Sequence, residues 1–116
     1  MTRTTGEALA AHALGKPGAW ADEPWEGDQV AKVGDKIFAF LGSETIGLKC
    51  GRTREEADEL LAAYPHDTSV MAYIGRYGWN TIRLDGAVPM DDLEELVDAS
   101  YNDVVSRLPK SKRPIA

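Results

Sequence analysis

The side chains most able to do chemistry are basic and aromatic residues in the middle of the chain. Lys and Arg can neutralise phosphate groups, and aromatic faces can stack on nucleic-acid bases. The residues that fit this pattern are Lys49, Arg52, Arg54, Tyr73, Arg76, Tyr77, Trp79 and Arg83. If the later strands lie beside the strand that ends near Lys49, these side chains converge on one surface. The alternative is that Trp79 belongs to the core and the charges are ordinary solvated surface.

A smaller combination within this region joins Lys49 and Asn80 close to Trp79. A Lys and an Asn could hold a carboxylate or a phosphate, the first as a point charge and the second as a hydrogen-bond partner. Asn80 could equally satisfy backbone groups at the start of a strand. The candidate residues for binding nucleic acid or an anion are therefore Lys49, Arg76, Tyr77, Trp79, Asn80 and Arg83.

Catalytic and metal-binding patterns are not found in the sequence. The only histidines, His12 and His66, lie outside the basic and aromatic set, and Cys50 is the only cysteine. Lys49 could lower the pKa of the neighbouring Cys50 thiol. Adjacent strand residues point to opposite faces, however, so an exposed Lys49 favours a buried and inert Cys50. We expect a protein without catalytic activity and assign no catalytic residue, metal or cofactor.

Length, composition and charge limit the function classes further. The chain has 116 residues, which predicts one domain over residues 1–116, with a flexible basic tail over residues 110–116. Its formal net charge is −6, which argues against coating nucleic acid by charge alone. The charge is also polarised, because residues 85–103 carry seven acidic residues and no Lys or Arg. No apolar run is long enough to span a membrane and no secretory signal is present, so we expect a cytoplasmic protein.

Strand patterns fill the central part of the chain. Val30–Val33 and Lys36–Leu41 flank Gly34-Asp35, and a leading glycine in a two-residue loop favours a type II′ hairpin turn. Pro24 limits any strand in the mixed segment 19–27 to a sheet edge. Gly47, inside a third strand, indicates a bulge or a close backbone approach. Further strands are predicted over residues 45–50, 69–74 and 79–84.

Three helices complete the pattern. One is predicted over residues 4–14, and a second starts at a capping box formed by Thr53 and Glu56 and ends at Pro65. The third runs to Leu108 with apolar residues at helical spacing, and Pro89 suits its first turn. Because hairpins dominate and helices do not alternate strictly with strands, we predict an α+β domain with an antiparallel sheet and helices packed on one side.

Four segments in this order resemble the MmcQ/YjbR family of small bacterial proteins. The resemblance covers residues 8–113 and is carried by Val30–Ala39, by Leu48-Lys49-Cys50 with a helix ending in Tyr64-Pro65, by Gly78–Gly86, and by residues 93–110. It implies a fold similar to the frataxin-like (CyaY-like) fold and a DNA-binding protein of the double-wing type. Lys49 and Asn80 stand at positions typical of the family. DNA is thus the expected partner, and the alternative is a protein-interaction or small-anion-binding module.

One position departs from the family pattern. Many relatives resemble Lys-Lys-His-Trp-Asn-Thr before the late strand, where this chain has Arg76-Tyr77-Gly78-Trp79-Asn80-Thr81. The family's histidine is therefore replaced by Gly78, and any role that depends on its imidazole cannot be transferred to this chain.

Overall fold

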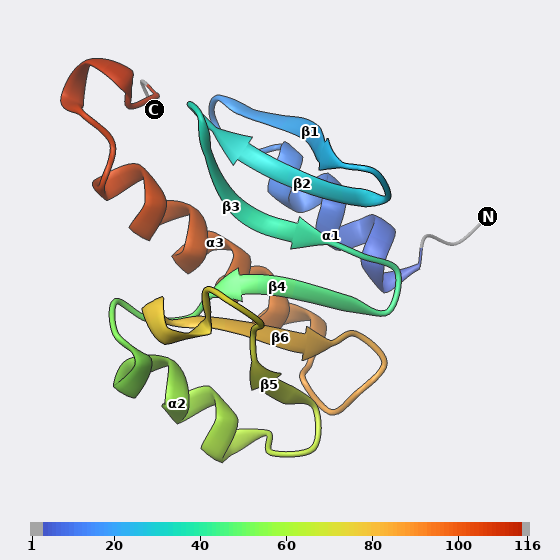
Figure 1. The fold of residues 1–116 in the computed structure, drawn as a ribbon. Coiled ribbons are helices and arrows are strands. Elements are labelled where there is room, and N and C mark those ends of the chain that lie inside the picture. The colour runs from blue at the N-terminus through green and yellow to red at the C-terminus, as the bar shows by residue number, and fades with distance from the viewer. Residues whose placement is uncertain (1–3, 115–116) are drawn as a thin grey trace.

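The computed structural model describes residues 4–114, which form one antiparallel sheet and three α-helices (Figure 1). The helices are α1 (Thr5–Leu14), α2 (Arg54–Ala63) and α3 (Met90–Ser106), with short 3-10 helices η1 (Gly75–Tyr77) and η2 (Lys110–Lys112). The strands are β1 (Ala19–Trp25), β2 (Asp28–Val33), β3 (Lys36–Leu41), β4 (Thr45–Lys49), β5 (Thr68–Val70) and β6 (Trp79–Arg83). Their order in the sheet is β1-β2-β3-β4-β6-β5, so the Pro24-containing β1 is an edge strand as predicted.

The predicted α+β class, with helices on one side of the sheet, is confirmed. Strand residues that alternate along β4 and β6, such as Ile46, Leu48 and Ile82, enter a core shared with α1 and α3. Phe38 meets the Tyr101 ring of α3 edge-on at a centroid distance of 5.2 Å. Burial of these apolar side chains is the main stabilising contribution to a domain of this size.

The glycine turn between β2 and β3 agrees with its prediction. Gly34 has φ 59°, and Val33 pairs with Lys36 across the turn, so the first loop position needs the left-handed backbone that glycine provides. At Gly47 the strand ladder is regular and no bulge occurs. A Cβ there would lie 2.9 Å from Cε of Met71, so this glycine makes room for a side chain.

Two local predictions need correction. The capping box of α2 is half formed: Thr53 Oγ accepts from the Glu56 N–H at 3.2 Å, but the Glu56 carboxylate accepts from the Arg52 N–H at 2.7 Å. The strand predicted over residues 69–74 ends at Val70. The chain then turns, because Ile74 N–H donates to the Ala72 carbonyl at 2.7 Å and Tyr73 adopts φ 65°.

The basic tail begins as an ordered turn. Lys110–Lys112 form η2, and the Arg113 guanidinium donates to the carbonyls of Leu108 and Ser106, both at 2.9 Å. The predicted tail therefore folds back on the end of α3 as far as Pro114, and its last two positions lie outside the described residues. Within residues 4–114, no helix combines the length and the apolar character required to cross a membrane.

Candidate functional site

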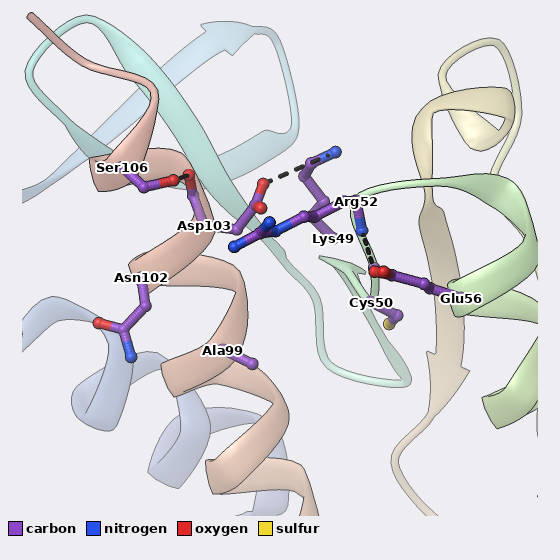
Figure 2. Close-up of a pocket in the computed structure, with 9 residues that line it drawn as sticks. Lys49, Cys50, Arg52, Glu56, Ala99, Asn102, Asp103 and Ser106 are labelled. Atoms are coloured by element: carbon purple, nitrogen blue, oxygen red, sulfur yellow. Dashed lines mark hydrogen bonds and ion pairs between the residues drawn. The ribbon is translucent and has the colours of Figure 1, made fainter.

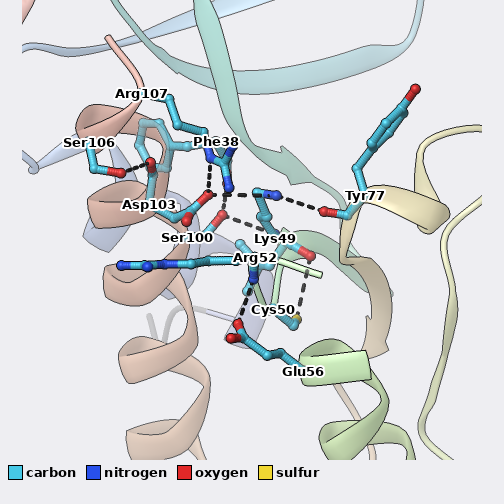
Figure 3. A network of polar contacts seen from close by, with 11 residues as sticks. Phe38, Lys49, Cys50, Arg52, Glu56, Tyr77, Ser100, Asp103, Ser106 and Arg107 are labelled. Carbon is cyan, nitrogen blue, oxygen red and sulfur yellow. Dashed lines mark hydrogen bonds and ion pairs between the residues drawn. The ribbon is translucent and has the colours of Figure 1, made fainter. Parts of the chain in front are cut away.

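Lys49, the last residue of β4, has a buried ammonium group (Figure 3). Its side chain is 7% exposed, its Nζ donates to the Tyr77 carbonyl at 2.7 Å, and it lies 3.7 Å from an Asp103 carboxylate oxygen. The Lys49 N–H donates to Ser100 Oγ at 3.0 Å, and Ser100 Oγ donates to the Phe38 carbonyl at 2.6 Å. Lys49 thus ties the end of β4 to α3 and to the η1 loop.

Trp79 and Asn80 are also buried. As neighbours in β6 they point to opposite faces of the sheet. Trp79 is 8% exposed and packs edge-on against Phe40 at 5.6 Å on the helix-free face. Asn80 is fully buried beneath α2, where its Nδ2 donates to the Ala57 carbonyl at 2.9 Å and its Oδ1 accepts from Arg54 at 2.5 Å. The Asn80 side chain therefore has the satisfied structural role that was the alternative interpretation.

Arg76 and Tyr77 form an exposed planar unit on the η1 loop. The Arg76 guanidinium carbon lies 4.8 Å from the Tyr77 ring centroid, and Arg76 Nη2 donates to Tyr77 Oη at 2.7 Å. The Tyr77 side chain is 52% exposed. The loop is fixed from below by Arg54, which donates to the Gly75 carbonyl at 2.7 Å and to the Trp79 carbonyl at 3.1 Å.

Gly78 ends this loop in a conformation that other residues rarely adopt. Its φ is 97°, and a Cβ would lie 2.2 Å from the Gly51 carbonyl oxygen. The N–H of Cys50 donates to the Gly78 carbonyl at 2.8 Å, which holds the two segments together. A residue with a side chain, histidine included, therefore cannot occupy position 78 with this loop geometry.

A cleft of about 420 Å³ lies between the end of β4 and α3 (Figure 2). Arg52 extends across it toward α3, and Lys49, Asp103 and Glu56 also line it. Cys50, another lining residue, is half-buried and donates from Sγ to the Leu48 carbonyl at 3.4 Å. Burial raises the pKa of the Cys50 thiol to about 11, so it stays protonated at neutral pH. Among residues 4–114, no three His, Cys, Asp or Glu side chains gather in a way that could hold a metal ion.

Charged residues are separated between the two ends of the sheet. One end of the sheet is formed by the β2–β3 turn, the end of β4, the η1 loop and the segment after α3. We call this the basic end. It holds nine of the 13 Lys and Arg residues: Lys36, Lys49, Arg52, Arg54, Arg76, Arg107, Lys110, Lys112 and Arg113. Its acidic residues are Asp35, Glu55, Glu56, Asp58 and Asp103, and Asp58 pairs with Arg54.

The opposite end, which we call the acidic end, has the reverse balance. Its acidic residues are Glu23, Glu26, Asp28, Glu44, Asp67, Asp85, Asp91 and Asp92. Arg83 lies at this end, where its guanidinium is 3.3 Å from an Asp85 carboxylate oxygen. The structure therefore brings together Lys49, Arg76, Tyr77 and Trp79, places Asn80 beneath them, and separates Arg83 from the group.

Two residues have roles at this site that were not predicted from the sequence. Arg54 was predicted only as part of the basic and aromatic surface, and its contacts with the η1 loop follow from the packing of α2. The role of Ser100 could have been predicted from the sequence, because Ser100 stands between Val97 and Tyr101 on the apolar stripe of α3. A small hydroxyl residue on a buried helix face indicates an internal hydrogen-bond partner.

Comparison with known proteins assigns the chain to a family. The YjbR family model matches residues 14–103. The uncharacterized protein YjbR of Escherichia coli, in strains K12 and O157:H7, is 33% identical over 113 residues, which covers 92% of either chain. A crystal structure of a Deinococcus radiodurans protein described as a DUF419 domain has a TM-score of 0.79 at 26% identity, covering 90% of this chain and 82% of that one. A Pseudomonas syringae protein shares the fold, with a TM-score of 0.65 at 20% identity over 86% of this chain and 96% of that one.

Proposed function

The chain belongs to the YjbR family, and we propose that it is a nucleic-acid-binding module that contacts phosphates through its basic end. The observation that carries this proposal is the separation of charge along the sheet. A protein with a formal net charge of −6 can still attract a polyanion when its positive side chains gather at one end.

Several cations at the basic end are available to a ligand. Among residues 4–114, the following form no ion pair with a carboxylate: Lys36, Arg52, Arg76, Lys110, Lys112 and Arg113. Phosphate contacts release condensed counterions, so unpaired cations such as these contribute more to binding than cations already neutralised by acids.

The Arg76–Tyr77 unit supports nucleic acid over an acidic protein as the partner. An exposed tyrosine ring with a guanidinium stacked on it offers a planar surface for an unpaired base. Lys49 contributes indirectly, because its hydrogen bond to the Tyr77 carbonyl fixes the loop that carries this unit. Trp79 and Asn80 support the same loop from inside the protein.

We propose binding rather than catalysis because the Cys50 thiol near this end is half-buried, and burial raises its pKa so that it stays protonated. His12 forms contacts with Glu94 and Asp98 between α1 and α3, away from the basic end. At the basic end, Lys49 Nζ lies 3.7 Å from an Asp103 carboxylate oxygen, but it is buried and donates to the Tyr77 carbonyl, which supports a structural role.

Fluorescence anisotropy with labelled single-stranded and duplex DNA tests the proposal. We expect binding at about 50 mM salt that weakens steeply by about 200 mM. The triple variant Arg52→Glu/Arg76→Glu/Lys110→Glu should lose at least about tenfold in affinity and have a shallower salt dependence. The charge-matched comparison is between the single variants Arg76→Glu and Arg83→Glu, and the second, at an exposed arginine of the acidic end, should bind like the unmodified protein. Absence of binding at about 50 mM salt, or an equal loss in the two single variants, would overturn the proposal.

A further inference from the structure

The helix-free face of the sheet contains a groove of about 810 Å³. Phe40, Gly47 and Thr81, on neighbouring strands, line it together with Met71. Because Gly47 has no side chain, the Met71 thioether packs directly on its backbone, as the 2.9 Å approach of an added Cβ shows. The groove therefore has a shaped apolar floor in the volume range of small-molecule sites.

Two exposed aromatic residues line the same groove. Trp25 ends β1 and is 57% exposed, and Tyr73 follows β5 and is 98% exposed. Tyr73 is also the one described residue other than glycine with a positive φ, at 65°. A bulky residue in this region is strained, and its ring gains no burial that would offset the strain. This combination favours a role in contacting a ligand over a role in stability.

The charge around the groove is negative. Asp28 is the one charged residue among those that line it, and it forms no ion pair within residues 4–114. Glu26 and Glu44 stand next to lining residues along the chain. Arg83 pairs with Thr45 in the sheet, but its guanidinium is held by Asp85. An anionic ligand would therefore meet unfavourable charge here, whereas a cation would be attracted.

We infer that this groove binds a small organic cation with an apolar body, of the quaternary ammonium class. Aromatic faces attract such cations through the ring quadrupole, and quaternary ammonium groups are poorly hydrated and fit apolar surroundings. Asp28 supplies the compensating charge, and the Thr81 hydroxyl offers a polar contact at the floor. The groove adjoins the η1 loop at Ile74, but no Lys or Arg is among the residues that line it.

A matched set of three probes tests the inference by amide chemical-shift titration of the intact chain. Benzyltrimethylammonium, phenylmethanesulfonate and benzyl alcohol carry the same ring with positive, negative and no charge. We expect the cation to shift the amides of Gly47, Met71 and Thr81 saturably, with an affinity at least about fivefold above that of either other probe. No saturable shift by the cation, or equal binding of the anion or the alcohol, would overturn the inference.

Three variants locate the site. Asp28→Asn should weaken the cation about threefold and leave the alcohol unchanged. Tyr73→Gly should weaken the cation about threefold, without a fall in the melting temperature because glycine relieves the positive φ. Trp20→Ala removes a half-exposed tryptophan outside the groove and should leave the affinity unchanged. The inference is wrong if the Trp20 variant loses as much affinity as the Tyr73 variant.

Discussion

Arg54 Nη2, at the start of α2, donates a hydrogen bond of 2.5 Å to the side-chain oxygen of Asn80, a fully buried residue of β6. The same Asn80 side chain donates to the Ala57 carbonyl, so it links α2 to the sheet through two contacts. These contacts hold α2 and the η1 loop in fixed positions, and the exposed Arg76–Tyr77 unit depends on that arrangement.

We expect Asn80→Ala to lower the free energy of unfolding by about 2 kcal/mol, because it removes two hydrogen bonds of a fully buried side chain and leaves a cavity beneath α2. Urea denaturation measures this change. Asn102→Ala, at an exposed position of α3, is the control and should change stability by less than about 0.5 kcal/mol. Equal effects of the two substitutions would contradict a structural role for Asn80.

Gly78→Ala should destabilise the protein more than Gly27→Ala does. Both glycines have positive φ, 97° and 85°, so alanine is strained at either position by about 1 kcal/mol. A Cβ at Gly27 meets no atom within 4 Å, whereas one at Gly78 lies 2.2 Å from the Gly51 carbonyl oxygen. Thermal or urea unfolding should therefore show an additional loss of at least about 2 kcal/mol for Gly78→Ala. Similar losses at the two positions would mean that the loop moves to accept a side chain.

The architecture was predictable because its signals are local. Gly34-Asp35 between two strands specifies a hairpin, and the apolar spacing from Leu93 to Leu108 specifies the last helix. The end of β5 at Val70 was not predictable, because the left-handed turn at Tyr73 carries no glycine or proline signal in the sequence.

The candidate site was predictable in part. Residues near each other in sequence, Arg76 and Tyr77, do share an exposed surface. The burial of Lys49 could not be predicted from its residue type. A buried lysine needs polar partners, and those of Lys49, the Tyr77 carbonyl and Asp103, come from two other segments. The position of Arg83 at the opposite end follows from strand direction, and this requires knowledge of which strands pair.

Asp98 makes the stability of the α1–α3 contact depend on pH. Desolvation raises the pKa of its carboxyl, but hydrogen bonds from Lys16 and His12 outweigh this and hold the pKa below 3.8. His12 also faces Glu94 at 3.3 Å. A carboxyl group whose pKa is lower in the folded state than in the unfolded state stabilises the protein at pH values above its unfolded-state pKa. This stabilisation is lost as the pH falls through the folded-state pKa.

Asp98→Asn should therefore lower the free energy of unfolding at pH 7, by about 1 kcal/mol or less because the carboxylate is 38% exposed. The difference from the unmodified protein should shrink as the pH falls below about 4, and urea denaturation across this range measures it. Asp85→Asn, at a 76% exposed carboxylate, should be neutral throughout. A difference that stays constant to low pH would show that charge on Asp98 is not its source.

Cys50 should react with iodoacetamide far more slowly than an exposed thiol. Its pKa of about 11 reduces the thiolate fraction at pH 7 about 100-fold relative to a cysteine of the ordinary pKa of 9.0. The alkylation rate should rise about tenfold for each pH unit between about 8 and 10, as the thiolate fraction does. The double variant Cys50→Ala/Ala99→Cys places a thiol on the exposed surface of α3 in the same cleft and should react at the ordinary rate. A Cys50 thiol as reactive as that control at pH 7 would show that the cleft activates it, and the case for a binding role without catalysis would then fail.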